Sequence, residues 1–397
     1  MTGQSAAFGS VAPKLNNLSL MLLLSILFAC QPDSPSSDTP DPLPEPAADY
    51  EDNPYPWGFI DNTGNLVIQS RFDEVRPFSD GLALVRTEGR WGYIDKRGQL
   101  SIPPTLRAAW PFVNGRARAQ QVDGKFGYIN TSGEWIISAE YADLSEFSEG
   151  LASFRKDESY GYIDTTGTIT IDAQFDKAAA FENNEAVVAI DNQYGIIDRS
   201  GNPILKYQYE RLKPFQGDIA RARRQGLYGY LNRKGEWTID PQFRQASDFQ
   251  RGVAAAATED RWGLIDTDGQ WIMEPQYDQL FYAGEDRWIA ANGQSYLLLT
   301  SLGEPVTTRS YTEIQPFSEG FAPYQERELW GYLRPDGSTM TASEYYLAWP
   351  YKNGLARVAT RYGLTFIDSL GRQLFNPRAN FFELRDFSEG LAPVEIY

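Results

Sequence analysis

The sequence predicts an all-β protein built from about ten tandem repeats. An aromatic residue followed by glycine recurs about every 34 residues from position 57 onward, and a fixed period of this size is typical of repeat architectures. Short alternating strand patterns separated by glycine turns recur with the same period. We therefore expect each repeat to be a three-stranded antiparallel meander.

The repeat positions are defined by the aromatic–glycine pairs, which we interpret as structural. They are Trp57-Gly58, Trp91-Gly92, Phe126-Gly127, Tyr160-Gly161, Tyr194-Gly195, Tyr228-Gly229, Trp262-Gly263, Trp330-Gly331 and Tyr362-Gly363. A glycine inside a strand weakens it unless something needs the space. We expect an aromatic ring of the adjacent repeat to occupy that space. The eighth repeat, residues 281–303, has Leu297 in place of the glycine and is predicted to be rearranged, through drift or as a binding patch.

Within one repeat, the second copy shows the expected order of elements. A strand at 81–85 and a strand at 91–95 form a hairpin, and a third strand follows around 99–102. An Asp-x-x-Gly turn, as in Asp95 to Gly98, joins the last two strands, because aspartate bonds the turn backbone and glycine supplies a positive φ. A connection of about ten residues with two aromatic residues leads to the next repeat and is expected to fill the gap between repeats.

The N-terminal segment has a different character and predicts export. Residues 1–30 contain one charge, Lys14, and an apolar run from Leu18 that is too short to span a bilayer but suits a signal peptide. The run ends at Cys30, the only cysteine, in a sequence that looks like a lipoprotein processing box. Residues 31–56 are rich in proline, serine and acids and predict a disordered tether, so the repeat domain comprises 57–397. An ordinary secretory signal is the alternative. In enterobacterial lipoproteins, which this segment resembles, an aspartate after the cysteine favours the inner membrane, so Gln31 at that position leads us to expect the outer membrane.

Composition narrows the functional classes. The chain of 397 residues has no histidine, one cysteine and a net charge of −17, which argues against metal centres, Cys/His nucleophiles and nucleic-acid partners. A basic cluster at Arg221, Arg223 and Arg224 is interpreted as a solvated strand edge. Paired carboxylates could serve a glycosidase, but no single pair stands out among repeated acids. Asp266 to Gly269 lacks the ligands of a calcium loop. We therefore expect no catalytic, metal or cofactor residues.

These residues resemble the bacterial WG-repeat family. Trp91 to Gly98, Trp262 to Gly269 and Phe387 to Ala392 carry the resemblance, which covers 57–397. It implies an all-β tandem array, often on envelope lipoproteins, with an interaction role. It does not imply catalytic residues.

The arrangement of the repeats has two possible forms. The array opens with a Trp-Gly strand and ends at 390–394 with a strand that lacks a Trp-Gly partner, so the two ends could close a propeller-like ring. Three strands per repeat, ten times over, fit an open twisted solenoid better than the usual ring of four to eight four-stranded blades. We therefore expect an open array, with a closed ring as the alternative.

The functional hypothesis from the sequence is a non-enzymatic scaffold for protein interaction. It is expected on the outer membrane, held only by its lipid anchor at Cys30 and facing the periplasm or the cell surface. A carbohydrate- or peptidoglycan-binding module is the first alternative and a hydrolase the second. The partner is an unidentified protein or envelope glycan.

Overall fold

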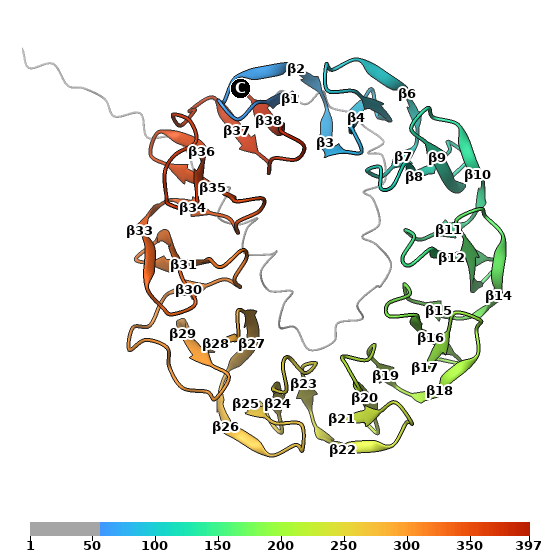
Figure 1. Ribbon diagram of the computed structural model, residues 1–397, viewed down its shortest axis with the longest axis vertical. Helices are drawn as coiled ribbons and strands as arrows, with labels where there is room; N and C mark the ends of the chain where they lie inside the picture. Colours follow the sequence, from blue (N-terminus) through green and yellow to red (C-terminus); the bar gives the residue numbers. More distant parts are fainter. Residues whose placement is uncertain (1–55) are drawn as a thin grey trace, which may run out of the picture. The chain divides into compact units, whose positions relative to one another are not determined.

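The computed structural model describes residues 56–397, which lie within one compact unit. The predicted signal peptide, Cys30 and nearly all of the tether lie outside the described residues. Every regular element of the described part is a β-strand, as the repeat pattern predicts. The strands form ten consecutive antiparallel sheets, here called blades 1 to 10, arranged around a ring (Figure 1).

The first five blades are all four-stranded. Their strands are β37 (Phe381–Leu384), β38 (Ala392–Ile396), β1 (Trp57–Ile60) and β2 (Leu66–Phe72) in blade 1; β3 (Glu74–Ser79), β4 (Leu82–Thr87), β5 (Arg90–Ile94) and β6 (Leu100–Leu106) in blade 2; β7 (Ala108–Ala109), β8 (Arg116–Gln120), β9 (Phe126–Asn130) and β10 (Trp135–Tyr141) in blade 3; β11 (Asp143–Leu144), β12 (Leu151–Lys156), β13 (Ser159–Asp164) and β14 (Ile169–Phe175) in blade 4; and β15 (Lys177–Ala178), β16 (Glu185–Ile190), β17 (Gln193–Asp198) and β18 (Pro203–Tyr209) in blade 5.

Blades 8 and 10 have three strands each, whereas blades 6, 7 and 9 have four. Their strands are β19 (Arg211–Leu212), β20 (Ile219–Arg224), β21 (Leu227–Asn232) and β22 (Trp237–Phe243) in blade 6; β23 (Gln245–Ala246), β24 (Ala254–Ala257), β25 (Trp262–Ile265) and β26 (Trp271–Tyr277) in blade 7; β27 (Gln279–Gly284), β28 (Arg287–Asn292) and β29 (Ser295–Thr300) in blade 8; β30 (Glu313–Ile314), β31 (Ala322–Glu326), β32 (Leu329–Leu333) and β33 (Thr339–Tyr345) in blade 9; and β34 (Leu347–Ala348), β35 (Leu355–Thr360) and β36 (Gly363–Asp368) in blade 10.

The expectation of three strands per repeat is wrong for eight of the ten blades. A fourth strand lies in the connection between repeats, and in six blades it is only two residues long, as in β11 and β15. A two-residue strand has no alternating pattern to read, which is why the sequence did not predict it. These short strands form the inner edge of each blade, and strands such as β14 and β18 form the outer edge (Figure 1).

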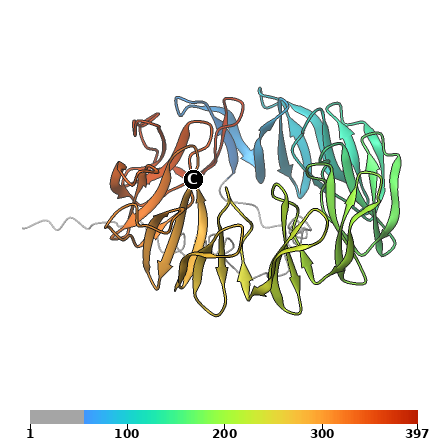
Figure 2. The ribbon, with the colours of Figure 1, turned by 60° about the horizontal axis from the view of Figure 1, so that its bottom comes forward.

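The expectation of an open array is also wrong, because the chain closes on itself. The first strand, β1, pairs antiparallel with the last, β38, from Trp57 opposite Glu395 to Ile60 opposite Ala392. Blade 1 therefore contains strands from both ends of the described residues, and the ring that the sequence offered as the alternative is the observed form (Figure 2). Closure satisfies the backbone groups that would otherwise remain unpaired on two edge strands.

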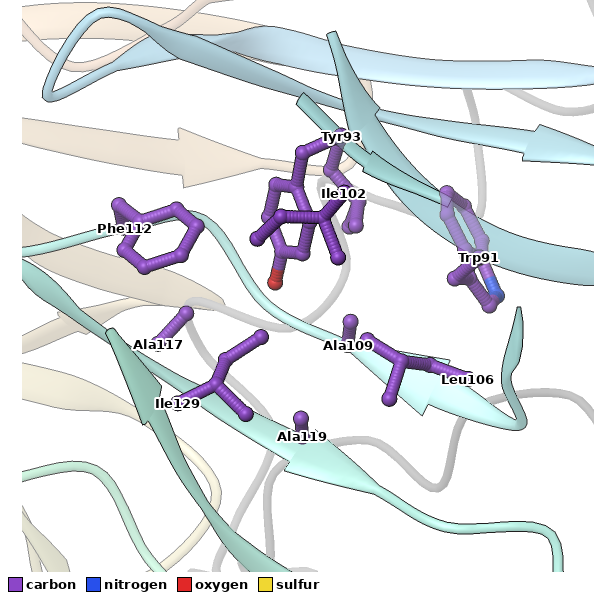
Figure 3. Packing of buried hydrophobic residues seen from close by; sticks show 10 residues of the cluster. Trp91, Tyr93, Ile102, Leu106, Ala109, Phe112, Ala117, Ala119 and Ile129 are labelled. Atoms are coloured by element: carbon purple, nitrogen blue, oxygen red, sulfur yellow. The ribbon is translucent and has the colours of Figure 1, made fainter. Parts of the chain in front are cut away.

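The hydrophobic core is divided into clusters that each lie between consecutive blades. Between blades 2 and 3, the ring of Tyr93 packs on the ring of Phe112 with centroids 4.7 Å apart, and Ile102 and Ile129 complete the contact (Figure 3). The Tyr93 hydroxyl donates to the carbonyl of Trp110 at 2.8 Å. The aromatic residues of the connection thus fill the space between blades, as predicted, and each buried ring contributes roughly 2–3 kcal/mol.

The glycine of each aromatic–glycine pair is explained by a backbone contact rather than by a ring. The outer strand bulges over the glycine, so that a β-carbon on Gly58 would lie 2.5 Å from the Ile68 carbonyl oxygen. The expected occupant, an aromatic ring of the adjacent repeat, is therefore wrong. At Gly195 the ring of Tyr207, in the same blade, adds to the backbone contact.

Blades 8 and 10 keep their inner strands, β27 and β34, but lack the outer strand, and they also lack this glycine. Leu297 takes its place in blade 8. In blade 10, Gly363 lies beside the hairpin turn opposite Thr360, and Thr365 occupies the position equivalent to the other glycines, so the register predicted for Tyr362-Gly363 is wrong. Both outer segments remain only as isolated bridges, such as Leu299 with Pro305. A side chain at this position fills the space that the bulged outer strand requires.

Candidate functional site

The tryptophans of the predicted repeat positions belong to the blades' interior rather than to a binding surface. Trp57, Trp91 and Trp330 are 3%, 6% and 5% exposed, and Trp262 is half-buried. The glycines beside them face strand backbone. The structure therefore places Trp57, Trp91 and Trp330 inside their blades, where their rings cannot stack on a ligand.

The acids of the Phe-Ser-Glu-Gly turns connect neighbouring blades. The Ser148 hydroxyl donates to the carbonyl of Phe181 in the next blade, at 2.5 Å, and the Glu149 carboxylate accepts from the backbone N–H groups of Asn183 and Asn184, at 2.8 Å each. The same contacts cross the ring closure, where Ser388 donates to the carbonyl of Phe78. These carboxylates already hold structural partners.

The aspartates of the Asp-x-x-Gly turns are also held by the backbone. Asp164 accepts from the N–H groups of Thr166 and Thr168, and hydrogen bonds, above all from the Thr166 side chain, lower the pKa of Asp164. Asp266 makes the equivalent bonds to Asp268 and Gln270. Among residues 56–397 no group of three or more potential metal-binding side chains comes together, and no helix there is long and apolar enough to cross a membrane.

The basic cluster of blade 6 is only partly a solvated strand edge. The side chain of Arg221 is 11% exposed, because it donates to Asp248 at 2.8 Å and to the carbonyl of Ala246 in the next blade. Arg118 of blade 3 is buried in the same way, with its guanidinium 3.6 Å from the ring centroid of Trp110 and 2.6 Å from the Leu144 carbonyl oxygen. The interpretation as a solvated edge is therefore wrong for Arg221, which fastens two blades together.

The most exposed aromatic side chains of the described residues gather on two adjacent blades. They are Tyr346, Tyr362, Phe382 and Tyr397, with exposures of 48%, 59%, 36% and 64%, and together they are here called the aromatic patch.

The antiparallel strands of blades 10 and 1 bring these four residues to one face. Tyr346 and Phe382 lie where the inner strands β34 and β37 begin, Tyr362 lies in the hairpin after β35, and Tyr397 follows β38. All four are thus at the same end of their blades. The rings of Phe382 and Tyr397 are in edge contact at 5.4 Å.

A backbone segment joins the two halves of the aromatic patch. Gly363, next to Tyr362, packs against the backbone of Arg378, and the carbonyl of Asn380 accepts from the N–H of Tyr397 at 3.1 Å. The guanidinium of Arg361 lies 4.5 Å from the ring centroid of Tyr362. The patch therefore combines exposed rings with one cationic side chain, that of Arg361.

The aromatic patch could not be predicted from the 34-residue period, because that period identifies only aromatic residues that recur in every repeat. Tyr346, Phe382 and Tyr397 do not occupy the repeated aromatic positions, and Tyr362 was assigned to one of them by mistake. The available signal was this departure from the period, since aromatic residues outside the repeat pattern have no assigned place between blades.

A shallow open hollow of about 530 Å³ lies at the outer side of the junction between blades 10 and 1. It is lined by Asn62, Thr63, Gln373, Leu374, Phe375, Asn376 and Arg378. Its polar lining and openness distinguish it from an enclosed active site.

Comparison with known protein families identifies the repeat. The family described as "WG containing repeat" matches residues 57–91, 91–126, 126–159, 160–194, 194–228, 228–261, 262–287, 301–330 and 330–360. This protein belongs to that family. Within 57–397 the WG repeat matches leave out 288–300 and 361–397. These segments include nearly all of the second strand and all of the third strand of blade 8, and all of the third strand of blade 10, the two blades without the repeat glycine.

Comparison with solved structures finds distant likenesses to this WG-repeat protein. A computationally designed protein, Ika8, is 14% identical with a TM-score of 0.37, and the match covers 67% of this chain and 93% of that one. A eukaryotic initiation factor is 11% identical with a TM-score of 0.46, covering 72% and 94%. BamB from Moraxella catarrhalis is 11% identical with a TM-score of 0.36, covering 73% and 94%. No curated protein matches the chain significantly.

Proposed function

We propose that this WG-repeat protein is a non-enzymatic scaffold that binds a partner protein through the aromatic patch. A lipid on Cys30 would anchor it to the outer membrane of a bacterial envelope, facing the periplasm or the cell surface. The observation that carries the binding role is the gathering of Tyr346, Tyr362, Phe382 and Tyr397 on one face of two adjacent blades.

Tyrosine and arginine side chains are the residue types that concentrate binding energy in protein interfaces. Tyr362 has Arg361 stacked on its ring, which supplies both an apolar face and a cation. The blades that carry the patch are also held together by specific contacts at the ring closure. At the closure the Arg385 guanidinium stacks on Trp57 at 4.1 Å and donates to the Val75 carbonyl of blade 2 at 2.7 Å. A surface on blades held in this way loses little conformational entropy when it binds.

Site-specific photo-crosslinking in cells tests this proposal. A photoreactive amino acid is placed at Tyr362, and a matched variant carries it at Leu370, which is 69% exposed in the turn at the other end of blade 10. The proposal predicts one discrete, protease-sensitive adduct from position 362 and none from 370. Adducts from both positions, or from neither, would contradict it.

A glycan-binding module is the second candidate, because exposed tyrosine rings can also stack on sugars. Co-sedimentation of fragment 57–397 with purified peptidoglycan separates the two. Saturable binding that free sugar competes away and that Tyr362→Ala abolishes would favour the glycan and overturn the protein scaffold. The Leu370→Ala variant serves as the control.

A further inference from the structure

Two cationic side chains from neighbouring blades converge on one tyrosine. Lys177, at the start of β15, donates from Nζ to the hydroxyl oxygen of Tyr194 at 3.0 Å, and Arg211, at the start of β19, donates from a guanidinium nitrogen to the same oxygen at 3.1 Å. Both cations also lie beside the Tyr194 ring, 5.5 and 5.7 Å from its centroid. Because they share one acceptor, the two positive groups are held within about 6 Å of each other.

No carboxylate of the described residues forms an ion pair with either cation. The acids that precede them in sequence are engaged elsewhere: Asp176 accepts from the N–H of Asn192 at 3.2 Å, and Glu210 accepts from the N–H of Gly226 at 3.0 Å. Two like charges at this separation repel each other. An anion placed between them would remove that repulsion.

The preceding blade shows which group belongs at this position. In blade 4, Asp143 takes the place that Lys177 has in blade 5, since both open the inner strand and pair with the end of the second strand. The hydroxyl of Tyr160 donates to the Asp143 carboxylate at 3.3 Å. Blade 4 thus supplies its own carboxylate to Tyr160, whereas Tyr194 has one cation from blade 5, Lys177, and one from blade 6, Arg211.

We propose that Lys177, Tyr194 and Arg211 form a carboxylate-binding site that takes an acidic side chain from a partner protein. The Tyr194 oxygen accepts from both cations, so its own hydrogen is left to donate. Ammonium, guanidinium and phenol donors then converge on one point, and charge-assisted bonds of this kind are the strong ones. This inference rests on the proposed scaffold function for the nature of the partner, but the site lies on blades 5 and 6, whereas the aromatic patch lies on blades 10 and 1.

Further cations at the same end of blade 6 indicate that the ligand carries more than one carboxylate. Arg224, the last residue of β20, is exposed and stacks on Trp237 with its guanidinium 4.9 Å from the ring centroid. Hairpins and inner-strand starts share one face of the ring, so Arg211 and Arg224 face the same side. A peptide segment with successive Asp or Glu residues fits this arrangement.

Calorimetric titration of the protein with an oligo-glutamate peptide tests the proposal. At low ionic strength we expect saturable binding that weakens at physiological salt, as an exposed ionic contact should. Lys177→Gln and Arg211→Gln should each weaken binding about tenfold, since each removes one charge-assisted bond. Tyr194→Phe, which keeps the ring but removes the hydroxyl, should weaken it to a smaller extent.

The matched control is Lys206→Gln on β18 of the same blade. Lys206 is an exposed lysine on the outer strand, so it changes the net charge equally without touching the site. Equal loss of affinity in the control and in Lys177→Gln would overturn the proposal, because binding would then follow overall charge. Binding that all the variants leave unchanged would also overturn it.

Two further titrations separate the possible sources of the carboxylate. Oligogalacturonate carries carboxylates on a sugar chain, and polyphosphate carries none. Preference for oligo-glutamate supports a protein partner, whereas equal or tighter binding of either competitor contradicts it. If position 362 gives no crosslink but the peptide still binds in a Lys177-dependent way, only the role of the aromatic patch is refuted. If position 362 gives the crosslink but the peptide does not bind, only the carboxylate site is refuted.

Discussion

The carbonyl oxygen of Ile171 lies 2.5 Å from the position that a β-carbon on Gly161 would occupy. Any side chain there would push the bulged outer strand β14 away from β13. Each of the eight blades that have a regular outer strand has this glycine, and the two blades without that strand carry Leu297 and Thr365 in its place. The glycine of the repeat therefore determines whether the outer strand of a blade can form.

Substitution of Gly161 by alanine should destabilise the protein by about 3 kcal/mol, the upper range for overpacking against atoms that cannot move. Gly89→Ala is the matched control, because its β-carbon would meet nothing within 4 Å and only its positive φ of 71° is strained. We expect a cost of about 1 kcal/mol there. Chemical denaturation measures both, and equal losses would refute the close-approach explanation.

Disruption of the ring closure should have consequences that the same change elsewhere lacks. Val394 of β38 lies opposite Gly58, and Val188 lies opposite Gly195 in blade 5; both valines are fully buried. Val394→Asp and Val188→Asp should each destabilise the fold by burying a charge. Only the former should expose two complementary edge strands and produce oligomers. Light scattering after gel filtration distinguishes them, and a monomeric Val394→Asp ring of unchanged radius would contradict this.

The hydroxyl groups of buried tyrosines should contribute measurably to the contacts between blades. Tyr162 donates to the carbonyl of Ala179 in the next blade at 2.7 Å. Tyr162→Phe should lower the free energy of unfolding by about 1 kcal/mol, because the carbonyl loses its partner. The exposed Tyr362→Phe should change stability by less than about 0.5 kcal/mol. Thermal unfolding compares the two, and equal shifts would exclude a role for the hydroxyl.

The protein should lose stability in alkali. Burial raises the pKa of Tyr162 far above its ordinary value of 10.0 and raises that of Tyr345 to about 12. Below pH 10 both the folded and the unfolded state keep these protons, so the stability is fully present. Above it the unfolded state releases them first, and the free energy of unfolding falls as pH rises towards the folded pKa. Phenolate absorbance should therefore appear together with unfolding. Ionisation of all tyrosines near pH 10 in a folded protein would contradict this.

Cys30→Ser should release the protein from membranes, since a serine cannot carry the proposed thioether-linked lipid. Fractionation of cells that express the variant measures this, with the unchanged protein in the pellet as reference. The Gln31→Asp variant is the companion test of membrane choice and should move the protein to the inner membrane. A Cys30→Ser protein that stays in the membrane fraction would show that the processing box is misread.

The sequence predicted the aromatic residues that are buried between blades better than those that are exposed on the surface. The aromatic residues of the connections, such as Phe112, which packs on Tyr93 of the preceding blade, were expected between blades because their period matches that of the repeat. The aromatic patch was not expected, since exposure of Phe382 or Tyr346 depends on which neighbour the folded ring places beside it. Convergence of Lys177 and Arg211 on Tyr194 likewise depends on the packing of blades 5 and 6.

The sequence alone determined the class of fold and the repeat. Strand alternation, turn residues and the 34-residue period are local properties, and they recur in every repeat. Only the tertiary structure decided that the array closes and that eight blades have a fourth strand. Pairing of Trp57 with Glu395 joins residues more than three hundred positions apart, and whether they meet depends on a small rotation accumulated over ten blades. No single repeat contains that information.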